Sequence, residues 1–400
     1  MKDILTLNSI SHVVDDVFDT TYRVSSDVEN PVGIMLRSFN MHEYELSPNT
    51  IAIARAGAGT NNIPCDKYAE EGVVVFNTPG ANANAVKELV LLGLLLGSRK
   101  VSESIEWTKT LKGKGDEVAK LVEKGKANFA GTEVYRKKMG VIGLGAIGAL
   151  VANIGLSLGM EVYGYDPYLS VTAALRLSRH VNVVKELDEM FKVCDFITLH
   201  VPYIPESNKG MINAGTIRKM KDGVVIINCA RGELVDNQDI IKAVESGKVR
   251  KYICDFPKDE IIGVENIVCI PHLGASTEEA EDNCAIMAAK QLIDYIENGN
   301  VTNSVNYPSC SMPRTTNYRL VILHKNVSGM LATITSTVGN EGINISNLSN
   351  QSRGNFAVTI LDVDNEVSEN SIKHIAQVDG VIKVREIKYE EAKDRNSPPS

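Results

Sequence analysis

The sequence is short of several features that mark large classes of protein. Its seven cysteines form no C-x-x-C pair and their number is odd, which argues against a zinc site or a disulfide framework and favours a reducing compartment, the cytoplasm. An excess of positive charge is also lacking. The formal net charge is -8, which disfavours binding to nucleic acid or to an anionic membrane. The longest apolar run, Leu89–Gly97, is far shorter than the roughly 20 residues of a bilayer span, and the first residues show no signal-peptide pattern. We therefore expect no metal, no nucleic-acid partner and no membrane partner.

What the sequence does contain is a long alternation of apolar runs and helical patterns. Its 400 residues are enough for two to three domains. The runs 32–38, 50–57 and 72–80 resemble buried parallel strands that end in small or polar residues. A second series of strands and helices begins near Lys138, with the spacing of βαβ units, which predicts an α/β fold with parallel sheets. The stretch 278–297 reads as one helix, long enough to return to the first segment.

The last quarter of the chain has its own pattern. Residues 306–317 include two prolines and several small polar residues, as linkers do. Residues 318–389 predict the order strand, helix, strand, strand, helix, strand, which is ferredoxin-like. The tail 390–400 is charged and rich in Pro and Ser, so we expect it to be disordered.

A glycine-rich motif in the second series predicts a dinucleotide site. The stretch "GLGAIG" follows an apolar strand and precedes a helical pattern, and Asp166 lies 18 residues after Gly148 at the end of the next strand. Gly143 would permit the tight turn, Gly145 would let a pyrophosphate approach, and Gly148 would let helix and strand pack. Because Asp166 would repel a 2′-phosphate and no Arg follows it directly, NAD is favoured over NADP. The plainer interpretation is a glycine turn with a solvated Asp.

Three polar residues at successive strand ends suggest the chemistry. Arg231 suits a substrate carboxylate, which a guanidinium binds bidentately. His272 suits a base that takes a hydroxyl proton, and Glu260 suits a carboxylate that orients the imidazole. Each also has a plain interpretation, since a lone Arg is usually a surface charge and a lone His usually a structural hydrogen-bonding residue. The order Arg, Glu, His beside a dinucleotide motif favours catalysis.

These motifs carry a resemblance to a known family. "RAGAGTNNI", "FNTPGANANAVKEL", "GVIGLGAIG", "GYDPY", "LHVPYIPESNKGMIN", "NCARGELVD" and "PHLGAST" occur in the order found in the D-isomer-specific 2-hydroxyacid dehydrogenases, and the resemblance runs from about Val32 to Tyr389. It implies a flavodoxin-like substrate lobe, 1–88 with 276–310, and a Rossmann NAD lobe, 89–275. It also implies NAD-dependent oxidation of 3-phospho-D-glycerate to 3-phosphohydroxypyruvate by a homo-oligomer, dimer or tetramer.

The resemblance assigns roles to individual residues. Arg231 and His272 match the family's "CARG" and "PHLG" motifs, and Glu260 lies five residues after Asp255, as the family's catalytic Glu does. The family often reads D-V-F-x-x-E-P where this chain reads "DFPKDE", and alignment on Phe-Pro would give the role to Asp259 instead. By the same resemblance, residues that bind substrate are Arg37, Ser38, Gly59, Asn82, Arg231 and His272, with Arg37 the best candidate for the phosphate and Arg55 and Lys87 weaker ones. Residues of the NAD site are Thr78, Gly143, Gly145, Ala146, Ile147, Gly148, Asp166, Val201, Pro202, Cys229, Ala230, Arg231, Asp255, His272, Leu273, Gly274 and Ala275.

The segment 318–389 resembles an ACT regulatory domain. In serine-inhibited relatives a His and an Asn of the first motif and an Asn of the second bind serine at a domain interface, which here implies His324, Asn326 and Asn344 as a site for L-serine. The alternative is a module that only dimerises the chain.

Two other functions remain open on the sequence. The same chemistry serves other 2-hydroxy acids, including glyoxylate or hydroxypyruvate, D-lactate and erythronate 4-phosphate. An NAD-sensing corepressor shares the dehydrogenase body and the Arg, Glu and His, although such proteins lack an ACT-like tail.

Overall fold

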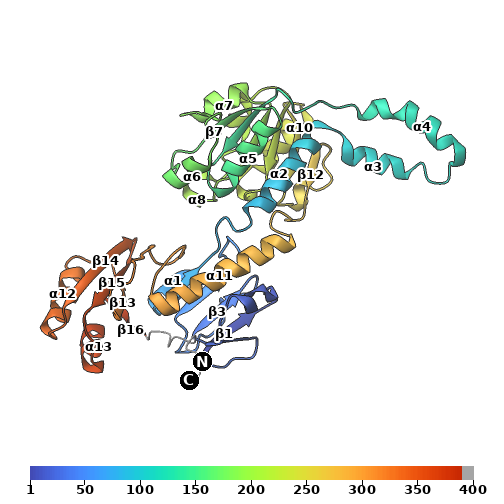
Figure 1. Ribbon diagram of the computed structural model, residues 1–400. Coiled ribbons are helices and arrows are strands. Elements are labelled where there is room, and N and C mark those ends of the chain that lie inside the picture. The colour runs from blue at the N-terminus through green and yellow to red at the C-terminus, as the bar shows by residue number, and fades with distance from the viewer. Residues whose placement is uncertain (390–400) are drawn as a thin grey trace, which may run out of the picture. The chain divides into compact units, whose positions relative to one another are not determined.

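The computed structural model describes residues 1–389, and the predicted tail 390–400 lies outside them (Figure 1). The chain divides into two compact units, one made of residues 1–81 and 281 onward, the other of residues 82–280. The chain therefore passes from one unit to the other between residues 81 and 82 and again between residues 280 and 281. The boundaries predicted from the sequence were 88/89 and 275/276. No helix of residues 1–389 combines the length and the apolar character needed to cross a membrane.

The first unit contains a five-stranded parallel sheet in the order β2-β1-β3-β4-β5. Its strands are β1 (Lys2–Leu7), β2 (Tyr22–Ser25), β3 (Gly33–Leu36), β4 (Ala52–Arg55) and β5 (Val74–Phe76). The last three were predicted from the sequence. Strands β1 and β2 were not, because β1 has only two buried residues, Ile4 and Leu5, and β2 is four residues long. Helix α11 (Glu278–Asn298) packs Ala285, Ala288 and Leu292 into the same core, while α1 (Cys65–Glu70) precedes β5.

The second unit is a seven-stranded parallel sheet in the order β12-β11-β10-β9-β6-β7-β8, which confirms the predicted doubly wound Rossmann lobe. Its strands are β6 (Lys138–Ile142), β7 (Glu161–Tyr165), β8 (Asn182–Val183), β9 (Phe196–Leu199), β10 (Val224–Asn228), β11 (Val249–Cys254) and β12 (Ile267–Cys269). One core joins the sheet to α2 (Ala83–Ser98) and α5 (Ala146–Ser157). The other joins it to α7 (Leu187–Val193), α9 (Ala214–Lys219) and α10 (Asn237–Glu245). Short helices α6 (Val171–Arg176) and α8 (Pro205–Asn208) complete the unit.

An arm extends from the body of this second unit (Figure 1). It consists of α3 (Val101–Lys109), η2 (Gly115–Glu117), α4 (Val118–Gly125) and η3 (Lys126–Phe129). Trp107 and Phe129 hold its two sides together, with ring centroids 5.2 Å apart. Neither α3 nor α4 buries a residue, and in the turn that follows α3 Leu111 is buried.

The C-terminal part of the first unit has the predicted βαββαβ order. Its elements are β13 (Tyr318–Lys325), α12 (Met330–Asn340), β14 (Ile345–Arg353), β15 (Phe356–Val363), α13 (Glu369–Ala376) and β16 (Val381–Lys388), with the sheet order β14-β15-β13-β16. Leu320 and Ile322 face a core with α12 and α13. Because side chains alternate along a strand, Val321 and Leu323 face the other way, where they share a core with α11.

Three arginines of this C-terminal part bind the last carbonyls of α11. Arg319 donates to the carbonyl of Asn298 at 2.9 Å and Arg314 to that of Glu297 at 2.9 Å, while Arg385 donates to those of Tyr295 and Ile296. The last carbonyls of a helix have no partner within the helix and carry partial negative charge, so cations are favoured there. The ACT-like fold is thus docked on α11 of the same unit.

Candidate active site

The predicted arginine and histidine follow two strands of the second unit, β10 and β12, that flank β11. Strands β10, β11 and β12 run parallel, with Asn228 opposite Cys254 and Cys254 opposite Cys269. All three strands therefore end at one edge of the sheet, where ligands of open α/β sheets bind. Arg231 and His272 each come three residues after such an end.

The turn that presents Arg231 is shaped by a residue the sequence analysis did not name. Asn228 is fully buried, and its Oδ1 accepts the N–H groups of Ala230 and Arg231 at 3.1 and 3.3 Å while its Nδ2 donates to the carbonyl of Arg231 at 2.8 Å. An Asn that bonds the backbone two and three residues ahead is a known turn former, so the signal was present in "NCARG". The half-buried Arg231 donates from Nη1 to the carbonyl of Ala230 at 2.7 Å, and its remaining donors can serve a carboxylate.

Asp255 fixes the loop after His272. Asp255 is 1% exposed, and its carboxylate accepts the N–H groups of Leu273 at 2.8 Å and Gly274 at 2.9 Å. Its own N–H donates to the carbonyl of Asn228 at 3.0 Å, which joins this loop to the Arg231 turn. Burial raises the pKa of Asp255, and the two backbone donors and nearby His272 oppose that rise.

His272 lies exposed with a left-handed backbone, at φ 55°. Its ring lies 4.7 Å from that of Phe256, tilted by 49°. Within residues 1–389 no hydrogen bond joins the imidazole to Glu260 or Asp259. Glu260 lies on η5 (Asp259–Ile261) and accepts hydrogen bonds from Asn237 and, at 3.3 Å, Gln238. The predicted dyad partner is thus held by α10 in this structure.

The glycine loop has the geometry that a dinucleotide requires. Gly143 has φ 90°, and a Cβ there would lie 2.5 Å from the carbonyl oxygen of His200. A Cβ at Gly148 would lie 1.8 Å from the carbonyl oxygen of Gly143, so only glycine allows the close packing of strand and helix. A Cβ at Gly145 would meet nothing within 4 Å, which leaves open space at the N-terminus of the 12-residue α5. The loop therefore fits a pyrophosphate.

Asp166 holds this loop from the end of β7. Its Oδ2 accepts the N–H of Leu144 and its Oδ1 accepts the N–H of Tyr168, both at 2.9 Å. Each carboxylate oxygen has a further lone pair, so ribose hydroxyls can still bind.

A partly buried histidine to which the sequence gave no role, His200, lies under the loop. The Nε2 of His200 is 2.9 Å from the hydroxyl of Thr198, and its Nδ1 is buried with no hydrogen-bond partner. Burial lowers the pKa of His200 to about 3, so the ring stays neutral beneath the place for the pyrophosphate.

The other predicted cofactor residues of the second unit lie at the same edge. Ala146 and Ile147 form the first turn of α5. The rest come directly after β9, β10 and β12, and they are Val201, Pro202, Cys229, Ala230, Leu273, Gly274 and Ala275. Asn82, which was predicted to bind substrate, caps α2 by position, and its buried Oδ1 has no hydrogen-bond partner among residues 1–389.

The substrate candidates of the first unit also follow strand ends. Arg37 and Ser38 follow β3, and Gly59 comes after β4. Thr78, which was predicted for the NAD site, is buried and comes after β5. Arg37 forms an ion pair with Glu281. Lys87, a weaker phosphate candidate on α2 of the second unit, donates to Asn84 at 2.6 Å.

The three residues predicted to bind L-serine do not all lie together within one chain. His324 is 2% exposed, and its ring nitrogens lie 2.9 Å from the carbonyl of Lys325 and 2.8 Å from the hydroxyl of Thr359. Strand register pairs His324 with Ala357, at the opposite end of β15 from Asn344, which precedes Ile345. Asn326 donates to the carbonyl of Gly354 at 3.0 Å. Burial lowers the pKa of His324, so this ring is a neutral part of the interior.

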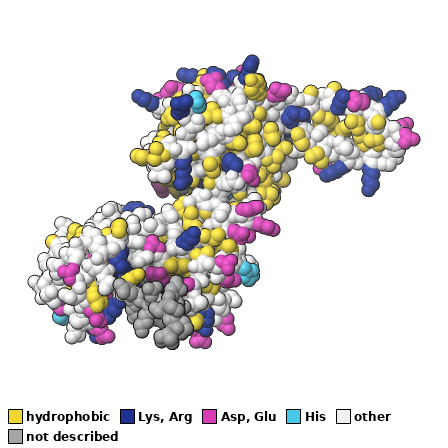
Figure 2. Space-filling model, viewed as in Figure 1, with side chains coloured by type: hydrophobic (Ala, Val, Ile, Leu, Met, Phe, Trp, Pro, Cys, Tyr) yellow, Lys and Arg dark blue, Asp and Glu magenta, His cyan; other side chains and the backbone are white. Residues whose placement is uncertain are grey.

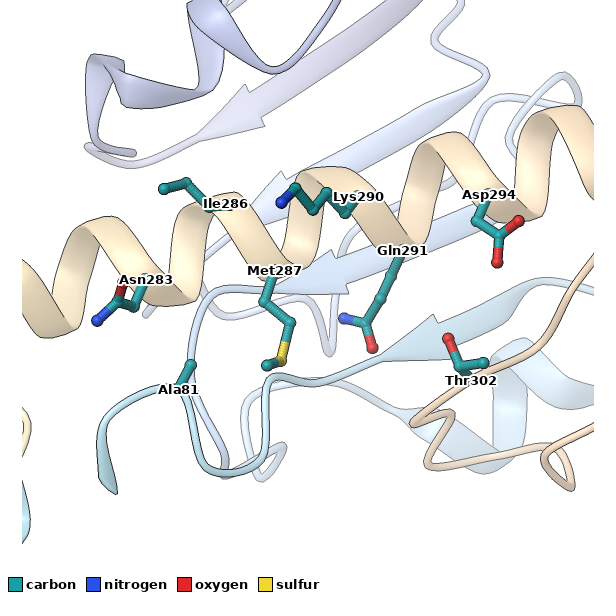
Figure 3. Close-up of a pocket in the computed structure, with 8 residues that line it drawn as sticks. All are labelled: Ala81, Asn283, Ile286, Met287, Lys290, Gln291, Asp294 and Thr302. Atoms are coloured by element: carbon teal, nitrogen blue, oxygen red, sulfur yellow. The ribbon is translucent and has the colours of Figure 1, made fainter. Parts of the chain in front are cut away.

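A separate groove of about 530 Å³ lies in the first unit along α11 (Figure 3). In the close-up, Met287 and Gln291 point from the helix toward the side of Ala81 and Thr302. None of the predicted catalytic residues lines it, so its volume does not mark the reaction site. Its lining residues are Ala81, Asn283, Ile286, Met287, Lys290, Gln291, Asp294 and Thr302.

Known proteins share this architecture. Residues 93–274 match the family model described as "D-isomer specific 2-hydroxyacid dehydrogenase, NAD binding domain". The D-3-phosphoglycerate dehydrogenase of Haemophilus influenzae is 32% identical over 85% of this chain and 82% of its own, and D-3-phosphoglycerate dehydrogenase 1 of Saccharomyces cerevisiae is 32% identical over 82% and 71%. The NAD⁺-bound 3-phosphoglycerate dehydrogenase structure of Entamoeba histolytica aligns at a TM-score of 0.58 and 26% identity, covering 76% of this chain and 98% of that one. The protein is therefore an NAD-dependent oxidoreductase that belongs to the D-isomer-specific 2-hydroxyacid dehydrogenase family.

Proposed function

We propose that the chain oxidises 3-phospho-D-glycerate to 3-phosphohydroxypyruvate with NAD, the first step of phosphorylated L-serine synthesis. The observation that carries the proposal is the shared sheet edge of the second unit, where Arg231, Asp255 and His272 follow three adjacent strands of the sheet that also carries the glycine loop. Identity of 32% to D-3-phosphoglycerate dehydrogenases over most of the chain supports this substrate.

Each residue has one task in the proposed reaction. NAD, when bound, supplies the ring that accepts hydride from C2 of the substrate. Arg231 binds the substrate carboxylate through its free donors, and His272 accepts the proton of the C2 hydroxyl as the carbonyl forms. Glu260 orients the imidazole after exchanging its contact with Asn237, and Asp259 is the alternative.

The phosphate is assigned to Arg37. This guanidinium follows β3 and is paired with Glu281, so an arriving phosphate would compete with that carboxylate. In a chain with net charge -8, such local cations are needed to bind a highly anionic substrate.

We further propose a homo-oligomer with L-serine as effector. Two copies would be needed to bring His324 and Asn326 of one chain near Asn344 of another, because one chain holds them at opposite ends of its sheet. The arm offers a self-association surface, since Val101 is 40% and Ile105 52% exposed, and hydrophobic side chains show among its lysines in Figure 2. All seven cysteines are free thiols, which supports a reducing cytoplasmic setting.

An initial-rate assay tests the function. We expect NADH formation with 3-phosphoglycerate at a higher kcat/KM than with D-lactate or D-glycerate, and inhibition by millimolar serine. His272→Ala should lower kcat by about 10²- to 10⁴-fold because the base is lost, with NAD affinity retained. His12→Ala, whose side chain is fully exposed, is the control.

Three results would contradict the proposal. Near-normal turnover by His272→Ala would remove the assigned base. Equal rates with phosphorylated and unphosphorylated acids would favour another 2-hydroxyacid dehydrogenase. Binding of NAD without NADH formation from any acid of the panel would favour a sensor protein.

A further inference from the structure

Phe256 lies at the centre of the three strand ends. Strand β11 is the middle one of the three, between β10 and β12, and Phe256 is the second residue after it. Arg231 and His272 follow the two flanking strands. A side chain at this place can therefore touch both loops.

The contacts of Phe256 reach both neighbours. Its ring packs against that of His272 at 4.7 Å. On the other side, a Cβ at Gly232 would lie 3.2 Å from the Cβ of Phe256, so the loop after Arg231 runs directly against this residue. Phe256 is a spacer between the loop of the carboxylate-binding cation and the loop of the base.

The backbone of Phe256 is held firmly enough to serve as a reference point. Its N–H donates to the Sγ of Cys254 at 3.2 Å, and that thiol donates to the carbonyl of Phe256 at 3.3 Å. Cys254 itself is 1% exposed. Asp255, the intervening residue, is bonded to both flanking loops.

His272 needs such support, because its imidazole is exposed and forms no hydrogen bond to a carboxylate among residues 1–389. We propose that Phe256 is a positioning residue, which holds the His272 ring and the Arg231 turn at the separation that the reaction requires. The inference rests on the proposed function for the choice of substrate. Ring contacts of this kind restrict rotation of both partners.

Three variants distinguish the effect of the aromatic ring of Phe256 from the effect of its side-chain volume. Phe256→Ala should lower kcat by about 10- to 100-fold, because a displaced base misses its geometry, while the KM for NAD changes little. Phe256→Leu keeps apolar contact with Gly232 but lacks the ring, so it should recover only part of the loss. Phe256→Tyr keeps the ring and should restore kcat. A substrate deuterated at C2 should show a larger isotope effect with Phe256→Ala, as hydride transfer becomes rate-limiting.

A second measurement needs no substrate. Carbethoxylation of His272 by diethyl pyrocarbonate, followed by peptide mass spectrometry, should be several-fold faster in Phe256→Ala than in wild type or Phe256→Tyr. If wild type fails to oxidise phosphoglycerate, the proposed function fails and this comparison still decides the contact. Unchanged carbethoxylation, or unchanged kcat in Phe256→Ala and Phe256→Leu of an active enzyme, would overturn the inference.

Discussion

Single residues set the charge under the cofactor. His200 is held neutral beneath the glycine loop, because burial lowers the pKa of its ring to about 3. A folded-state pKa below the ordinary value of 6.5 means that the unfolded chain binds the proton first as pH falls. Stability is therefore present above pH 6.5 and is lost as the pH falls toward the folded-state value.

His200→Asn should remove this dependence. Between pH 6.5 and 5, the unfolding free energy of wild type should fall relative to that of the variant by up to about 1.4 kcal/mol per pH unit. Urea unfolding, followed by circular dichroism and by the single tryptophan, Trp107, would measure it. The exposed His180 of the same lobe gives the control, His180→Asn. Parallel curves for wild type and His200→Asn would show that the ring is not held neutral.

Among single residues, those that belong to motifs could be predicted from the sequence. Those whose role depends on contacts between loops could not. Gly143, Asp166, Arg231 and His272 stand in recognisable spacings, and the structure places each at the strand ends. The roles of Asn228, as of His200 and Phe256, depend on contacts across loops, which a linear pattern does not encode.

Helix α11 shows how one element depends on distant side chains. Arg319, which donates to its last carbonyl, is fully buried together with its partner Asp362, whose carboxylate also accepts the N–H and hydroxyl of Thr315. Burial raises the pKa of Asp362, but the hydrogen bonds from Arg319 and Thr315 outweigh it, and the pKa is lowered.

Asp362→Asn should destabilise the first unit by about 3–5 kcal/mol, because it leaves a buried guanidinium unpaired. Since the folded-state pKa lies below the ordinary 3.8, the carboxylate stabilises the protein above that pH, and the difference between wild type and variant should shrink as pH falls below it. Thermal and urea unfolding would measure both effects. Glu366→Gln breaks the exposed pair with Lys388 and should change the free energy of unfolding far less, because exposed ion pairs contribute little. Equal losses in the two variants would refute the argument.

Elements were predicted best where their apolar period is long. The pattern of residues 278–297 identified α11 almost to its ends, and the βαββαβ order was confirmed. Strands β1 and β2 escaped because few of their side chains are fully buried. The capping of α11 by three arginines was invisible, since it joins residues far apart in the chain.

The stability of the first unit depends on the C-terminal part of the chain, because the two share one hydrophobic core. Val321, Leu323, Val358 and Ile360 complete the core around α11. A chain ending at Pro313 would expose that core and leave the carbonyls of the helix without their arginines.

Truncation after Pro313 should therefore abolish the unfolding transition of the first unit, while the second unit keeps its own transition and its affinity for NAD. Differential scanning calorimetry with and without NAD would separate the two. A chain ending at Tyr389 serves as the control and should match the full-length protein. Retention of both transitions by the shorter chain would show that the C-terminal part is an independent module.

The return of α11 to the first unit also sets an order of events during synthesis. The five strands of that unit leave the ribosome within the first 76 residues, but the helix that covers their sheet ends at Asn298. At elongation rates of about 5–20 residues per second the wait is on the order of 10–40 s. Through that interval the nascent sheet has a bare apolar face, so the first lobe to be made is the last to fold and the one most in need of a chaperone.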